Sequence, residues 1–69
     1  MEIIESYERW SNKLQNIQEY QLFAVDNGDF EIFCQTYKDD EASELIYIGE
    51  ITYSNDFVKT CDEWHEENM

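Results

Sequence analysis

The charge of this chain limits both what it can fold into and what it can bind. Its 69 residues include 17 aspartates and glutamates but only four lysines and arginines, a formal net charge of −13. So few cations cannot form a basic patch for nucleic acid, and an anionic membrane surface would repel the chain. High net charge also opposes collapse. We nevertheless predict a folded protein, because 42% of the residues are hydrophobic, 16% are aromatic and none is proline.

We expect one small domain over residues 1–69. The sequence has no linker, repeat or low-complexity tract, and its only glycines are Gly28 and Gly49. It has no apolar run long enough to span a membrane and no secretory signal at its beginning, so we expect a cytosolic location. There, Cys34 and Cys61 are expected to stay reduced and to be buried as small hydrophobic side chains.

Hydrophobic spacing predicts a helix at each end of the chain. An apolar stripe with spacings of three and four residues favours a helix over residues 3–18. Ser54 suits the N-cap of a second helix that runs to about residue 67. The members of the first stripe are Ile3, Tyr7, Trp10, Leu14 and Ile17.

A hairpin is predicted between the helices. Asn27-Gly28 between two apolar runs is typical of a two-residue type I′ turn. A turn of that length pairs Val25 with Phe30 and Phe23 with Ile32. The first strand of the hairpin is expected over residues 20–26.

Residues 45–53 are predicted to form a third strand. This segment is apolar on both of its faces, so its register stays open. A five-residue loop before it would place Ile46 and Ile48 beside Ile32 and Cys34. A loop one residue longer or shorter would exchange the two faces.

The expected fold is therefore α+β, a three-stranded antiparallel meander with an N-terminal and a C-terminal helix (α-β-β-β-α). Two arrangements stay open. Either the helices divide between the two faces of the sheet, or one aromatic face is left uncovered for a partner. We expect Trp10, Trp64 and the phenylalanines in the core, and one or two exposed tyrosines.

Catalysis and metal binding are not expected. The single histidine, His65, lacks the second histidine of a His-Glu-x-x-His metal motif, and we expect it partly exposed near a helix end. Residues 39–44 carry charge without the glycine or the spacing of a calcium loop. No phosphate-binding loop or nucleophile motif occurs. We expect no enzyme activity, no metal and no cofactor.

The carboxylates are the candidate binding groups, and most of them fall into three clusters. Solubility needs a net charge of only roughly 2–8, so the additional repulsion favours a basic partner. On a helix the last cluster forms two columns with side chains about 5–6 Å apart, a spacing similar to that of DNA phosphates. The clusters are Glu2, Glu5 and Glu8; Asp39, Asp40, Glu41 and Glu44; and Asp62, Glu63, Glu66 and Glu67.

In size, acidity, richness in tyrosine, asparagine and glutamate, and expected architecture, the chain resembles small phage-encoded anti-defence proteins, above all anti-CRISPR proteins of the DNA-mimic type. The resemblance implies an inhibitor encoded by a phage or mobile element and acting in the host cytosol. Its partner would be a CRISPR effector nuclease or another basic DNA-binding defence enzyme. Carboxylates of the three clusters, with Tyr37 beside them, would engage the arginines that read the PAM and so block target DNA.

A different hypothesis gives the main role to apolar contacts. The chain would then be an interaction module that binds through an exposed aromatic sheet face, as an immunity protein, a homodimer, or an inhibitor that blocks an allosteric site or forces dimerisation. Raised salt separates the two hypotheses, because it weakens a charge-based complex and leaves an apolar interface nearly unchanged.

Overall fold

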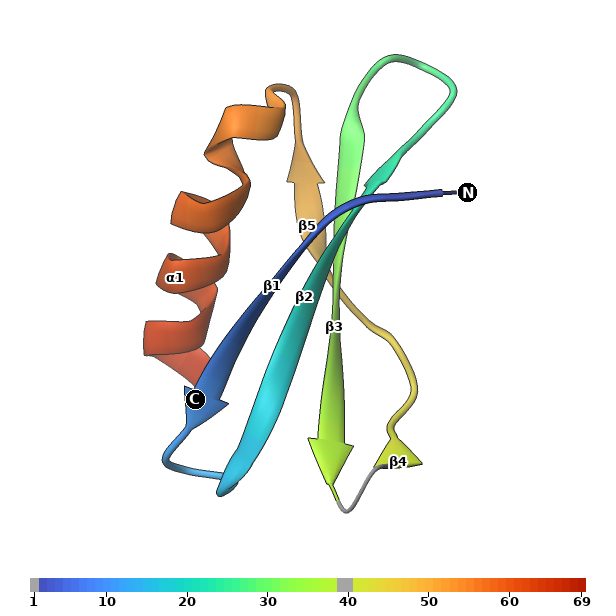
Figure 1. The fold of residues 1–69 in the computed structure, drawn as a ribbon. Coiled ribbons are helices and arrows are strands. Elements are labelled where there is room, and N and C mark those ends of the chain that lie inside the picture. Colours follow the sequence, from blue (N-terminus) through green and yellow to red (C-terminus); the bar gives the residue numbers. More distant parts are fainter. Residues whose placement is uncertain (1, 39–40) are drawn as a thin grey trace.

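The computed structural model describes residues 2–38 and 41–69. Its strands form one antiparallel sheet, in which β1 pairs with β2, β2 with β3, and β3 with both β4 and β5. Helix α1 lies against one side of this sheet (Figure 1). The elements are β1 (Ile3–Ser11), β2 (Asn16–Ala24), β3 (Phe30–Lys38), β4 (Glu41–Ala42), β5 (Ile46–Ile51), the 3-10 helix η1 (Ser54–Asp56) and α1 (Phe57–Asn68).

The expected α-β-β-β-α order is wrong, because the predicted N-terminal helix is a β-hairpin. Residues 3–18 contain β1, a turn over residues 12–15 and the start of β2. The Ser11 hydroxyl accepts a hydrogen bond from the Leu14 amide at 3.1 Å, and Gln15 turns the chain with a φ of 57°. The aromatic and β-branched residues of this segment also suit strands. The apolar stripe therefore divides, with Tyr7 facing α1 and Trp10 on the opposite side of the sheet.

The predicted register of the second hairpin is also wrong, by one residue. Ala24 pairs with Phe30 and Leu22 with Ile32. Gly28 has a φ of +89°, while Asn27 does not share the positive φ that a type I′ turn requires. The Gly28 amide instead donates to the Val25 carbonyl and the Val25 amide to the Asp29 carbonyl, which makes a longer loop.

That one-residue difference decides which side chains form the core. Side chains alternate between the faces of a sheet, so a shift of one residue exchanges them. Leu22 and Tyr20 now share a face with Ile32 and Cys34, whereas the predicted register placed Phe23 there.

The third predicted strand is present as β5. At Ile46, its first residue, the register is the one expected for a five-residue loop. Ile46 pairs with Cys34, and a bulge then shifts the pairing so that Ile32 lies opposite Gly49. The bulge turns Ile48 toward the core, where it packs at the edge of the hydrophobic cluster. The short strand β4 occupies part of the polar turn, and Asp39 and Asp40 lie outside the described residues.

The C-terminal helix lies where the sequence predicts it. Ser54 begins η1 rather than capping α1, and Asp56 precedes α1 without a side-chain capping bond. The buried residues of α1 are Phe57, Cys61 and His65, at helical spacings of four.

The hydrophobic core lies between α1 and one face of the sheet. Both cysteines are buried and free, as the sequence predicts. Trp64 packs against the core, but the expectation for Trp10 is wrong, because 52% of it is exposed. No helix among the described residues is long and apolar enough to cross a membrane. The fully buried core residues are Tyr20, Leu22, Ile32, Cys34 and Cys61, with Phe57 at 1% exposure.

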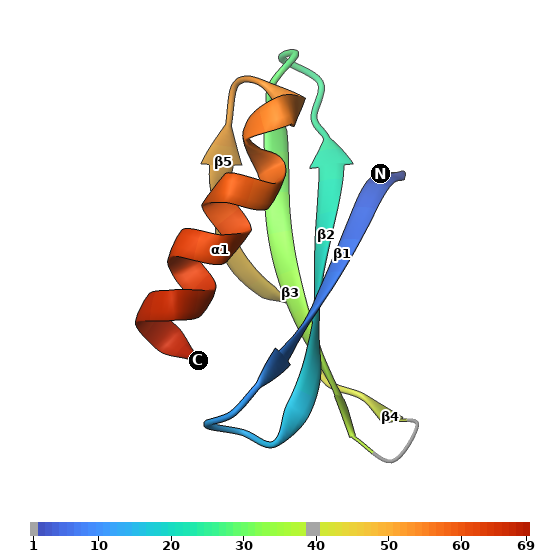
Figure 2. The ribbon, with the colours of Figure 1, turned by 60° about the vertical axis from the view of Figure 1, so that its left-hand side comes forward.

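Figure 2 shows that the described chain places no element over the other side of the sheet, opposite α1. Of the two arrangements left open by the sequence, the uncovered face is therefore the one that forms. We call this side the open face and the side against α1 the helix face. By register and alternation, the open face carries Ile3, Ser6, Glu8, Trp10, Ile17, Glu19, Gln21, Phe23, Glu31, Phe33, Gln35, Tyr37, Tyr47 and Glu50.

Candidate interaction surfaces

The open face carries large apolar side chains in two rows that cross the strands. The first row runs from Trp10 on β1 through Ile17 on β2 to Tyr37 on β3, each opposite the next. Trp10 is 52% exposed and Ile17 42% exposed. Because cross-strand neighbours are within side-chain contact distance, the row forms a continuous apolar strip at one end of the face.

The second row is aromatic and lies toward the other end. The Phe23 and Phe33 rings meet edge to face with centroids 5.4 Å apart, and Phe33 meets Tyr47 at 5.5 Å. Phe23 is only 8% exposed because its neighbours cover it, whereas Tyr47 at the edge strand is 54% exposed. The sequence expectation of one or two exposed tyrosines is confirmed by Tyr47 and Tyr53.

Two pairs of glutamates face each other across strands of the open face. Glu8 lies directly opposite Glu19, and Glu31 directly opposite Glu50. Like charges in this position destabilise a sheet. No lysine or arginine occupies a described strand position on this face, because Arg9 and Lys38 alternate to the helix face.

Neighbouring polar side chains on the open face donate hydrogen bonds to one of these glutamates. The Glu19 carboxylate accepts hydrogen bonds from the Gln21 amide at 2.7 Å and from the Tyr37 hydroxyl at 3.1 Å. The hydrogen bond to Glu19 raises the pKa of Tyr37, and the negative charges of Glu19 and Glu8 act in the same direction. The face is thus negative around its apolar rows.

On the helix face, in contrast, carboxylates form ion pairs with a cation. Arg9 lies 3.2 Å from Asp62 and 3.3 Å from Glu66, both on α1. The Tyr7 hydroxyl donates to Asp62 at 2.8 Å, and this hydrogen bond raises the pKa of Tyr7. Asp62 and Glu66, both from the C-terminal acidic cluster, therefore link α1 to β1.

His65 is buried rather than partly exposed as expected. Its exposure is 4%, and its Nε2 lies 3.0 Å from the carbonyl oxygen of Trp10. Because a carbonyl only accepts, Nε2 donates this hydrogen bond, and Nδ1 forms a hydrogen bond with the Tyr20 hydroxyl at 2.7 Å. Both ring nitrogens are thus used to join α1 to β1 and β2.

The two thiols are also structural. Burial raises the pKa of Cys34 to about 11 and that of Cys61 to about 12, so both stay protonated near neutral pH. Neither is a nucleophile in that state. Among the described residues, no three histidine, cysteine, aspartate or glutamate side chains are arranged to hold a metal ion.

The structure separates the predicted acidic clusters. Glu2, Glu5 and Glu8 are not on a helix: Glu5 and Glu8 lie on β1, and Glu8 alone is on the open face. Glu41 and Glu44 are exposed near β4, and Asp39 and Asp40 lie outside the described residues. Glu63, Glu66 and Glu67 are exposed on α1, while Asp62 is half-buried.

Sequence reasoning missed several residues of the open face. It placed Trp10 in the core and assigned no role to Glu19, Glu31 or Glu50, because each is isolated among polar or apolar neighbours in the sequence. The signal for a strand in this segment is its content of β-branched and aromatic residues, Ile3, Ile4, Tyr7 and Trp10, because its apolar and polar residues do not alternate strictly. Tyr37, which was singled out, does lie on this face.

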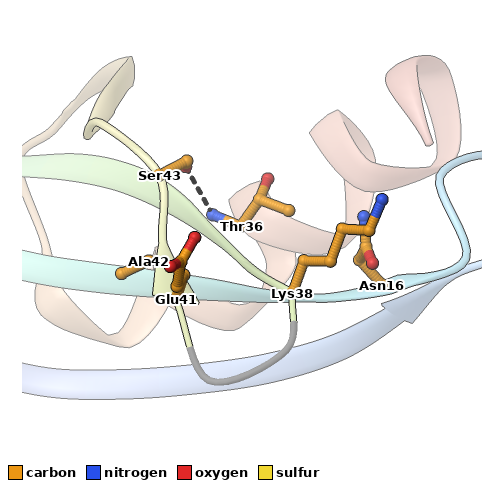
Figure 3. Close-up of a pocket in the computed structure, with 6 residues that line it drawn as sticks. All are labelled: Asn16, Thr36, Lys38, Glu41, Ala42 and Ser43. Atoms are coloured by element: carbon orange, nitrogen blue, oxygen red, sulfur yellow. Dashed lines mark hydrogen bonds between the residues drawn. The ribbon is translucent and has the colours of Figure 1, made fainter.

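A shallow pocket of about 460 Å³ lies where β4 meets β3 (Figure 3). Its serine is already engaged, since the Ser43 hydroxyl accepts from the Thr36 amide and donates to the Glu44 carbonyl. The lining residues are Asn16, Thr36, Lys38, Glu41, Ala42 and Ser43.

Comparison of the chain with protein-family models, with curated proteins and with solved structures found no match. The function is therefore inferred from the surfaces described above.

Proposed function

We propose that the protein is a non-enzymatic inhibitor that binds a basic nucleic-acid-handling enzyme, and that its carboxylates take the place of nucleic-acid phosphates. The enzyme class we favour is a CRISPR effector nuclease, whose PAM and target-DNA binding the protein would block. Such a protein needs no chemistry of its own. It needs only a rigid, strongly negative surface.

The observation that carries this proposal is the acidic charge left without cations after folding. The ion pairs among the described residues are those of Arg9 with Asp62 and Glu66. Glu63 and Glu67 stand exposed one turn apart on α1, and further glutamates face one another on the open face. This charge costs folding stability through self-repulsion, and a basic partner offsets that cost.

An inhibition assay tests the proposal directly. A purified CRISPR effector loaded with guide RNA is incubated with the protein, and then labelled target duplex is added. We expect loss of both DNA binding and cleavage. We expect the loss to weaken as NaCl is raised from 0.1 to about 0.5 M, because screening shortens the range of the attraction.

The order of addition provides the control. Protein added after the effector has bound its target should inhibit far less than protein added before, because both compete for one surface. Effectors of several types and a restriction nuclease are tested in parallel. Undiminished DNA binding by every enzyme at low salt would contradict the proposal.

A second candidate is favoured by the uncovered sheet face. The protein would be an interaction module held by apolar contacts, for instance as an immunity protein or as an inhibitor at an allosteric site. The exposed side chains of Trp10, Ile17 and Tyr47 support this candidate. It predicts a complex that survives 0.5 M NaCl and an excess of competing duplex DNA.

A further inference from the structure

The open face is an unoccupied side of the sheet with exposed apolar side chains at both of its ends. A sheet face that is not packed on a core is ordinarily polar, with alternation of apolar and polar residues between faces. Here Trp10, Ile17 and Tyr47 are each more than two-fifths exposed. Apolar surface of this kind marks an interaction site.

The charges on the face decide what can cover it. A second copy of the chain would bring Glu8, Glu19, Glu31 and Glu50 against an identical set of carboxylates, with no lysine or arginine at a described strand position of the face to neutralise them. Desolvating that many like charges is prohibitive. An anionic lipid or nucleic-acid surface is excluded by the same repulsion. A basic protein surface is the complementary occupant.

The geometry favours arginine over lysine. Glu8 with Glu19, and Glu31 with Glu50, are carboxylate pairs that a planar guanidinium can bridge with parallel hydrogen bonds. The first pair lies next to the Trp10 row, and the second lies next to the row that ends at Tyr47. A guanidinium can therefore stack on an aromatic ring while it pairs with a carboxylate.

We infer that the open face is the surface that recognises arginine side chains of a basic protein partner, with one glutamate pair and one aromatic neighbour at each end. The inference rests on the proposed function and deepens it, because it moves the contact from the acids of α1 to the sheet. Glu31 is four residues from Gln35, which lies opposite Glu19, so the two pairs are about 14 Å apart along the strands.

The test uses two peptides of equal charge, octa-arginine and octa-lysine, titrated into the isotopically labelled protein while amide shifts are followed by NMR. We expect the arginine peptide to bind about tenfold more tightly, because lysine neither stacks nor pairs bidentately. We expect the largest shifts at Trp10, Glu19, Phe33 and Tyr47, and small shifts on the outer side of α1.

Matched variants separate the face from the overall charge. Glu8→Gln with Glu50→Gln removes two exposed charges from the open face, and Glu63→Gln with Glu67→Gln removes two from α1. We expect the first pair to lower affinity for octa-arginine about tenfold and the second less than threefold. Trp10→Ala is matched by Tyr53→Ala, which removes an exposed aromatic side chain outside the face. Circular dichroism checks that each variant is folded.

Each result decides between distinct outcomes. Equal losses from both glutamate pairs, or a larger loss from the α1 pair, would overturn the inference while leaving an acidic inhibitor intact. Arginine-selective binding at the open face with no inhibition of any nuclease would leave the inference standing and overturn the proposed function. A wild-type dimer in analytical ultracentrifugation that Trp10→Ala dissociates would overturn the inference in favour of a second copy.

Discussion

The two faces of the sheet are built from the same strands and differ in how they treat charge. On the helix face, Arg9 sits between Asp62 and Glu66, and buried aromatic and aliphatic side chains pack under α1. On the open face, glutamates oppose glutamates and large apolar side chains stay exposed. The comparison shows that the contacts that stabilise the fold lie on the helix face. The glutamate pairs and exposed apolar side chains of the open face lower the stability of the free protein, and a bound partner would offset this cost.

The largest expected effect is in the packing of the helix face. Phe57→Ala removes a side chain that is 1% exposed, and we expect a loss of about 3–5 kcal/mol in the free energy of unfolding. Trp10→Ala removes a larger but half-exposed side chain from the open face and should cost less than about 1 kcal/mol. Urea unfolding monitored by circular dichroism measures both. Similar losses would erase the contrast between the faces.

Alkaline pH should also act through the helix face. Burial raises the pKa of Cys34 to about 11 and of Cys61 to about 12, from 9.0 in the unfolded chain. Above pH 9 the unfolded chain therefore releases protons that the folded protein keeps. The stability contributed by each protonated thiol is complete below pH 9 and is lost as pH rises toward the folded pKa, by about 1.4 kcal/mol per pH unit.

Unfolding midpoints at pH 8, 9, 10 and 11 measure this slope. Cys61→Ala lowers stability at every pH but should flatten the decline between pH 9 and 11, because one of the two thiols is gone. A slope unchanged by this substitution would show that the thiol does not carry the effect.

His65 tests whether the polar contacts under α1 matter as well as its apolar ones. His65→Phe leaves the Tyr20 hydroxyl and the Trp10 carbonyl without their partner, and we expect a loss of about 1–3 kcal/mol. Tyr20→Phe combined with His65→Phe should cost less than the sum of the two single changes, because the Tyr20 hydroxyl and His65 Nδ1 are removed together and neither is left without the other. Strict additivity would mean that the two side chains do not interact.

The smallest expected effect is on the open face and has the opposite sign. Glu50→Lys replaces a like-charge pair with an ion pair to Glu31, and we expect a gain of about 0.2–1 kcal/mol. Glu44→Lys makes the same change of charge at an exposed loop position and should gain less. Thermal unfolding in 0.05 M and 0.5 M NaCl compares them, and the difference should shrink in salt. Equal gains would mean that only overall charge matters.

The second hairpin shows how far local sequence predicts the fold and where it stops. Asn27-Gly28 correctly marks a reversal between two strands, but β2 (Asn16–Ala24) begins four residues before and ends two residues before the strand predicted over residues 20–26. The predicted register was wrong because Gly28 adopts a positive φ and Asn27 does not. The loop is therefore longer than a type I′ turn. Turn residues indicate that the chain reverses, but the packing of Leu22 and Ile32 under α1 selects which face is buried.

The N-terminal segment shows the same limit in the candidate site. Ile3, Tyr7, Trp10, Leu14 and Ile17 fit a helical stripe, while Ile3, Tyr7, Trp10 and Ile17 are β-branched or aromatic residues that also suit strands. In isolation a helix satisfies its own backbone groups, whereas a strand needs a neighbour. Because that neighbour is β2, the sequence pattern alone could not place Trp10 and Glu8 on the open face.

The sequence by itself determined the excess of negative charge, the C-terminal helix with its buried Phe57 and Cys61, the chain reversal at Asn27-Gly28 and the burial of both cysteines. These are local or compositional properties. The tertiary structure alone decided that the N-terminal segment is a strand, which side chains share a face, and that glutamates oppose glutamates on a face left uncovered. Each of these depends on the register between strands, and register is set where a distant helix packs against the sheet.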